Sequence, residues 1–113
     1  MSISYYAISV RDHAQLGPLL EGGPTTAPPI DVAATYAALV RGAMVEGPPN
    51  ATLQWEGEGS YVFVDLSPRA IEVTHGTGGG EEQMDVVMDV LSVLQGQGLY
   101  VWDPQSGSWF PGS

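Results

Sequence analysis

The sequence contains no cysteine and no lysine, and these two absences exclude several classes of function. Without cysteine the chain has no disulfide, no thiolate nucleophile and no zinc site built on sulfur. Thirteen acidic residues stand against three arginines, which gives a formal net charge of -10. Because phosphate groups are bound mainly through Lys and Arg, we expect neither nucleic acid nor an anionic membrane as a partner.

The sequence also lacks a long apolar run. Nowhere do eighteen apolar residues follow one another, and the first residues show neither a basic segment nor a signal-like apolar stretch. The 113 residues, 43% of them hydrophobic, suffice to build one core. We therefore expect a single domain over residues 1–113 that is soluble and cytoplasmic.

The hydrophobic pattern predicts an α+β fold, since period-two alternation indicates strands and a 3.6-residue period indicates helices. The expected strands are 3–10, 52–56, 61–66, 70–74 and 99–103, with a return strand at 108–110. The expected helices are 32–41, capped by Asp31, and 81–95, and a short helical turn at 13–20. This order predicts an antiparallel sheet of four to five strands with two helices on one face, ferredoxin-like or a variant.

No catalytic machinery is recognisable in the sequence. His13 and His75 are the only histidines, and no serine stands in a Gly-x-Ser-x-Gly elbow. The glycine-rich stretch 76–80 precedes a helix, but Glu81 and Glu82 put negative charge where a bound phosphate would lie. We expect a flexible connection there, with His75 exposed beside it, and no catalytic residue, cofactor or metal ion.

Acidic residues form the main candidate site. Glu81, Asp85 and Asp89 repeat along the helix 81–95 with no cation to pair with, a like-charge row that costs the helix stability. They lie opposite the predicted apolar stripe, which comprises Met84, Val87, Met88, Leu91 and Leu94. This row is either a recognition surface for a cationic partner or a plainly solvated face.

Two further pairs of residues complete the predicted partner-binding set. Glu56 and Glu58 flank a tight turn, where their ordinary role is to keep the tip of a hairpin solvated. Trp102 and Asp103 stand beside another turn and combine an aromatic ring with an acid. Amphipathic aromatic residues are enriched at protein interfaces.

The segment 98–107, GLYVWDPQSG, follows an acidic helix and a glycine-rich loop. In these features the last third of the chain resembles small acidic bacterial immunity proteins of contact-dependent and type VI toxin systems. The resemblance implies a cytoplasmic, non-enzymatic antitoxin that binds a basic toxin domain. Two other classes stay open: a small-ligand-binding or enzymatic ferredoxin-like domain, with Trp55 and Tyr61 lining a pocket on the open sheet face, and a structural adaptor or homo-oligomer.

The charge balance predicts that the protein does not retain duplex DNA in a gel-shift experiment at physiological salt. Its three arginines are scattered along the sequence and cannot form a basic stripe. Retention at micromolar protein that weakens as the salt concentration rises would contradict this expectation.

Overall fold

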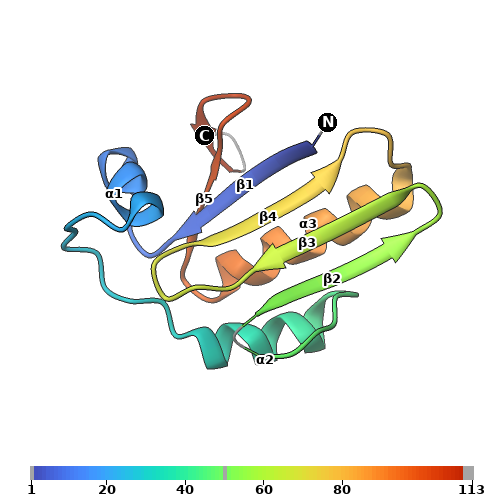
Figure 1. The fold of residues 1–113 in the computed structure, drawn as a ribbon, viewed down its shortest axis with the longest axis horizontal. Helices are drawn as coiled ribbons and strands as arrows, with labels where there is room; N and C mark the ends of the chain where they lie inside the picture. The colour runs from blue at the N-terminus through green and yellow to red at the C-terminus, as the bar shows by residue number, and fades with distance from the viewer. Residues whose placement is uncertain (1, 50, 111–113) are drawn as a thin grey trace.

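The computed structural model describes residues 2–49 and 51–110, which form one antiparallel sheet with the strand order β2-β3-β4-β1-β5-β6 (Figure 1). The strands are β1 (Ser2–Ile8), β2 (Thr52–Gly57), β3 (Ser60–Asp65), β4 (Ile71–Gly76), β5 (Tyr100–Asp103) and β6 (Ser108–Trp109). The helices are α1 (Leu16–Glu21), which follows a 3-10 turn at His13–Gln15, α2 (Val32–Gly42) and α3 (Glu81–Gly96). The predicted α+β class is confirmed.

The sheet has six strands, more than the four to five predicted, because Ser108–Trp109 pairs with β5. Strands β4 and β5 both run antiparallel to β1 and lie on either side of it, so β4, α3 and β5 form a split β-α-β unit around β1. The connection through α2 is different, because β2 lies at the sheet edge, separated from β1 by β3 and β4. None of the described helices is long and apolar enough to span a bilayer.

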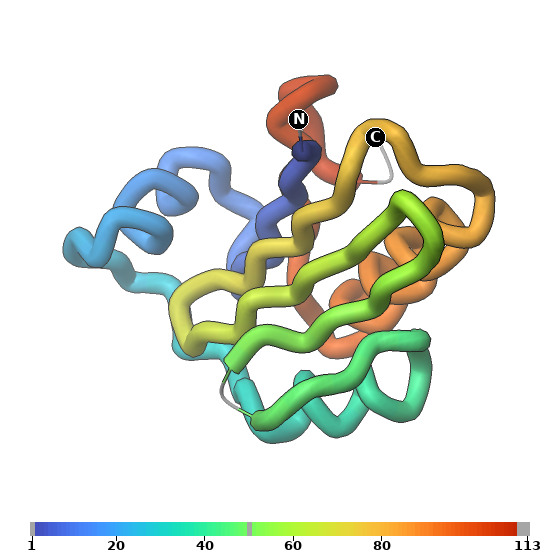
Figure 2. The backbone as a smooth tube through the Cα atoms, turned by 45° about the vertical axis from the view of Figure 1, so that its right-hand side comes forward, coloured from blue at the N-terminus to red at the C-terminus, as the bar shows by residue number. Residues whose placement is uncertain are grey.

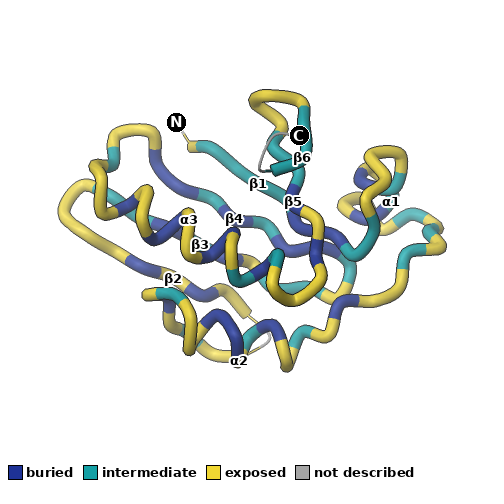
Figure 3. The backbone as a smooth tube through the Cα atoms, turned by 180° about the vertical axis from the view of Figure 1, so that it is seen from behind, coloured by how far each residue is buried: buried dark blue, intermediate teal, exposed yellow. Residues whose placement is uncertain are grey.

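Helices α2 and α3 lie on the same face of the sheet and form the main core with it (Figures 1 and 2). Asp31 caps α2 as predicted, since its side chain accepts a hydrogen bond of 3.0 Å from the amide of Ala34. Helix α2 contributes Leu39 to the core, and β2 contributes Leu53. Figure 3 shows the buried residues of α3 on its side that faces the sheet.

The predicted apolar stripe of α3 is wrong at two positions, because Met84 and Met88 are 38% and 44% exposed. The buried residues of this helix are Gln83, Val86, Val87, Val90, Leu91 and Leu94. The difference arises because α2 packs on one flank of α3: a Cβ atom on Gly42 would come within 2.8 Å of Val93 Cγ2. Helix α2 thus covers the flank of α3 that carries Val93, and the two methionines lie on the opposite flank.

A buried polar cluster joins α3 to the sheet. Gln83 accepts a hydrogen bond from the amide of Tyr61 at 3.0 Å and donates one to the carbonyl of Gly76 at 2.7 Å. His75 lies beside them on β4, stacked on Tyr5 with ring centroids 5.8 Å apart and only 3% exposed. The expectation of an exposed loop histidine is therefore wrong, because pairing with β1 extends β4 through Gly76.

The opposite face of the sheet carries a smaller core under α1. This second core contains Ile8, Leu16, Leu19 and Ala70. Arg69 fixes the segment that covers it: its Nε donates to the carbonyl of Leu19 at 3.1 Å, and a terminal nitrogen donates to the carbonyls of Pro18, at 2.8 Å, and Gly23. One guanidinium thus holds the second half of α1, and the residues that follow it, against the sheet.

We predict that Arg69→Met lowers the free energy of unfolding by about 2 kcal/mol, because three partly buried carbonyls lose a charged donor. Arg41→Met is the matched control, since Arg41 is exposed in the last turn of α2 and should change the free energy of unfolding by less than about 0.5 kcal/mol. Urea denaturation of both variants measures the difference. Equal losses would show that Arg69 does not anchor α1.

Candidate partner-binding site

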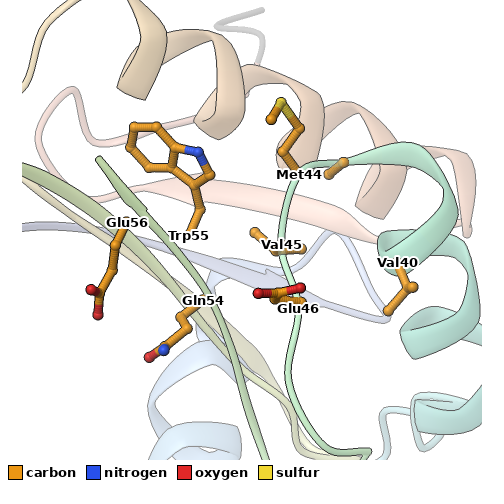
Figure 4. A pocket seen from close by; sticks show the side chains of 8 residues that line it. Val40, Met44, Val45, Glu46, Gln54, Trp55 and Glu56 are labelled. Carbon is orange, nitrogen blue, oxygen red and sulfur yellow. The ribbon is translucent and has the colours of Figure 1, made fainter. Parts of the chain in front are cut away.

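A hollow of about 560 Å³ lies between the end of α2 and the edge strand β2 (Figure 4). The residues that line it are Val40, Ala43, Met44, Val45, Glu46, Gln54, Trp55 and Glu56. Three successive residues of β2 take part, although neighbouring side chains of a strand point to opposite faces. The hollow therefore lies against the outer edge of β2.

The segment after α2 builds one wall of this hollow. The amide of Glu46 donates to the carbonyl of Gln54 at 3.0 Å, and the amide of Gln54 donates back to the carbonyl of Glu46 at 2.8 Å. Tyr36 of α2 holds the same segment through a hydrogen bond of 2.8 Å from its hydroxyl to the carbonyl of Gly47. Val45, the residue before these two anchors, is buried in the main core, so packing holds the wall in addition to the hydrogen bonds.

The two sides of the hollow differ in chemistry. Trp55 points to the helix side of β2, together with Met44, whereas Gln54 and Glu56 point away from it (Figure 4). Met44 and Val40 are 66% and 47% exposed, so an apolar surface remains open to solvent beside the indole. The arrangement offers apolar contact on one side and carboxylates on the other.

The acidic row of α3 is exposed, as the sequence predicted: Glu81, Asp85 and Asp89 all face solvent. Asp89 comes one turn before Val93, which packs near Gly42 of α2, so this carboxylate lies on the flank of α3 that faces α2. Among the described residues, no side chain or backbone group supplies a hydrogen bond or ion pair to these three carboxylates. Their charge remains available to a partner.

Glu56 and Glu58 lie at the same end of the molecule as the start of α3. Glu56 lines the hollow, and Glu58 is exposed in the turn that follows β2. The hydrogen bond from Tyr61 to Gln83 ties that hairpin to the first turn of α3 (Figure 1). The fold therefore gathers several of the predicted acidic residues around one end of the sheet.

Trp102 and Asp103 do not join this group, because β5 and β6 lie toward the opposite edge of the sheet from β2. Trp102 packs edge-on against Trp109, with ring centroids 5.2 Å apart. The carboxylate of Asp103 accepts hydrogen bonds from the amide of Gln105 at 2.9 Å and the hydroxyl of Ser106 at 3.1 Å. These contacts give both residues a role in shaping the β5–β6 turn.

The pKa values of two tyrosines on β1 are raised. Burial raises the pKa of Tyr5, and the carboxylate of Asp103 adds to the effect. Burial also raises the pKa of Tyr6, with a further contribution from Glu72. Both phenols therefore remain uncharged at neutral pH and add no negative charge to the middle of the sheet.

The predicted pocket between Trp55 and Tyr61 does not form, because the two side chains lie on opposite faces of the sheet. Trp55 is paired with Val62 and faces the helices, so the neighbouring Tyr61 faces away from them. Tyr61 instead packs beside Phe63, with ring centroids 5.0 Å apart. A shallow hollow of about 400 Å³ lies near this pair, lined by Thr52, Gln54, Phe63, Asp65 and Thr74.

No protein-family model matches this chain, and no curated protein matches it. Among residues 2–49 and 51–110, no three His, Asp or Glu side chains are grouped so that they could hold a metal ion.

Sequence reasoning missed Met44 and Glu46, because their short segment is not long enough to show strand periodicity. The signal that could have found them is the turn-forming run Gly47-Pro48-Pro49, which stands between the predicted helix 32–41 and the predicted strand 52–56.

We predict that Met44→Ser changes the free energy of unfolding by less than about 0.5 kcal/mol, since this side chain is mostly exposed. Val45→Ser is the matched comparison, because its side chain is buried and its loss should cost roughly 2 kcal/mol or more. Urea unfolding of both variants measures the contrast. A large loss of unfolding free energy in Met44→Ser would mean that the Met44 side chain supports the fold and is not available to a partner.

Proposed function

We propose that this chain is a non-enzymatic binding protein that holds a cationic segment of another protein at the hollow between α2 and β2. The observation that carries the proposal is the combination of exposed Met44 and Val40 with the carboxylates of Glu46 and Glu56 around one hollow. Recognition sites commonly join a desolvated apolar centre to polar groups that select the partner.

The charge of the whole chain supports a basic partner. A net charge of -10 accelerates the approach of a cationic surface and disfavours an acidic one. The row of Glu81, Asp85 and Asp89 extends the negative surface along α3, and Glu58 adds to it at the hairpin tip. In this proposal these residues guide the partner, while the hollow holds it.

The biological role that we propose is that of an immunity protein, which neutralises a basic toxin domain in the cytoplasm by covering its surface. The resemblance of the segment 98–107 to bacterial immunity proteins suggested this role. The acidic end of the fold supports it, because many proteins that act on nucleic acids bind them through cationic surfaces. An inhibitor of such a protein gains a faster approach and greater specificity by presenting carboxylates to that surface.

A second candidate function is favoured by the hollow on the open sheet face. Around Phe63 it gathers the amide of Gln54, the carboxylate of Asp65 and the hydroxyl of Thr74. An aromatic ring surrounded by polar groups suits a small polar ligand, as expected of a ligand-binding domain in a variant of the ferredoxin-like arrangement. The split unit of β4, α3 and β5 is the part of the topology that agrees with such a variant.

We predict that Asp89→Asn weakens binding of a cationic probe about two-fold to three-fold at low salt, because the removed charge lies on the flank of α3 that faces α2, the helix that lines the hollow. The probe is the peptide Lys-Val-Lys-Leu-Lys-Val with blocked ends, and its affinity is measured by NMR titration at low and physiological salt. The effect should shrink as the salt concentration rises.

Glu21→Gln is the charge-matched control, since Glu21 is exposed at the end of α1, which packs on the opposite face of the sheet. An equal loss of affinity in this variant would reduce the effect to net charge alone. Equally tight binding of the counterpart peptide Glu-Val-Glu-Leu-Glu-Val would overturn the proposed preference for a cationic partner.

A further inference from the structure

The outer edge of β2 is only partly paired. The β2–β3 hairpin closes with the pair Gly57 and Ser60 around a turn in which Gly59 has φ +68°. From this pair, every second residue of β2 exchanges hydrogen bonds with β3, and the residues between them turn their amide and carbonyl outward. Gln54 is one of these outward residues, as its bonds to Glu46 show.

Glu56 is the next outward residue along the same edge, two positions beyond Gln54. Among the described residues, none donates to the carbonyl of Glu56 or accepts from its amide on this outer side. The antiparallel direction of the bridge between Glu46 and Gln54 would place Met44 opposite Glu56, but the chain there already turns toward α2. The edge is therefore open beside the hollow.

We propose that a partner segment adds to this edge as a short antiparallel strand, with one of its residues paired to Glu56. This inference rests on the proposed function and names the conformation in which the partner is held. The amide of the partner residue donates to the carbonyl of Glu56, and its carbonyl accepts from the amide of Glu56. The existing bridge at Glu46 shows that the edge accepts such a strand.

The faces of β2 define the side chains of the partner. Residues directly paired across two strands point to the same face, so the partner residue opposite Glu56 lies on the side of the carboxylates of Glu46 and Glu56. A lysine or arginine fits that position. The residues before and after it point to the other side, toward Trp55, Met44 and Val40, where apolar side chains fit. The recognised pattern is one basic residue between two apolar residues.

A second copy of this chain is a poorer occupant of the edge. Antiparallel pairing of two β2 strands about a two-fold axis near Glu56 would bring the same carboxylates of both copies together. Like charges directly opposite one another destabilise a strand pair. With a net charge of -10 on each copy, the longer-range repulsion acts in the same direction. The observations therefore favour a cationic segment of another protein.

The experiment compares two variants at one position, with the peptide Lys-Val-Lys-Leu-Lys-Val as the probe. Glu56→Gln removes the charge and keeps the amide, whereas Glu56→Pro removes both. Proline is tolerated on an edge strand when its nitrogen faces outward, as it does here. We expect Glu56→Pro to weaken binding roughly ten-fold beyond Glu56→Gln, because the partner carbonyl loses its donor.

A second probe tests the unaltered protein, in case Glu56→Pro does not fold. In this peptide the central lysine is replaced by its α-hydroxy acid, so that an ester removes one N–H and keeps the side chain and its charge. We expect the ester peptide to bind roughly ten-fold more weakly than the amide peptide. Equal affinities of the ester and amide peptides would overturn strand addition.

The outcomes separate this inference from the proposed function. Salt-sensitive binding that is the same in Glu56→Pro and Glu56→Gln would overturn strand addition and keep the preference for a cationic partner. A second outcome is that both Glu56→Pro and the ester weaken binding, while the acidic peptide binds as tightly as the cationic one. That outcome would keep strand addition and overturn the preference for a cationic partner. A homodimer in solution that Glu56→Pro dissociates would overturn the inference, since a second copy would already cover the edge.

Discussion

A strand at the edge of a sheet leaves every second amide and carbonyl without a partner inside the sheet, and the proposed site depends on how β2 meets this constraint. The chain covers the edge at Gln54 with its own residue Glu46 and leaves it open at Glu56. Carboxylates beside an open edge disfavour pairing with other acidic chains and favour pairing with a basic one. The same charges therefore protect the edge and select its partner.

The rest of the fold holds that edge in place. Gln83 ties the β2–β3 hairpin to α3 through buried hydrogen bonds, and α2 packs against α3 at Gly42. Together these contacts fix the two walls of the hollow, one from α2 and one from β2. On the opposite face Arg69 anchors α1 far from the site, so that α1 shields the second core without covering the hollow.

The sequence allowed most elements to be placed, because Asp31 and the period of residues 81–96 are strong local signals. The sequence did not allow us to predict the orientation of α3 about its own axis. Met84 and Met88 are as apolar as the valines that are buried instead, and only the position of α2 decides between them. His75 was misplaced for a related reason, since the length of β4 depends on its pairing with β1, which is distant in sequence. Acidic residues of the candidate site could be chosen from the sequence, but the open edge could not.

The most direct test of the account is amide hydrogen exchange of the free protein at two residues of β2. The amide of Gln54 is bonded to Glu46, whereas no described residue accepts a hydrogen bond from the amide of Glu56. The account predicts that Gln54 is strongly protected and that Glu56 exchanges almost as fast as in an unfolded chain. Equal and strong protection at both amides would contradict it, because the edge would then already be covered.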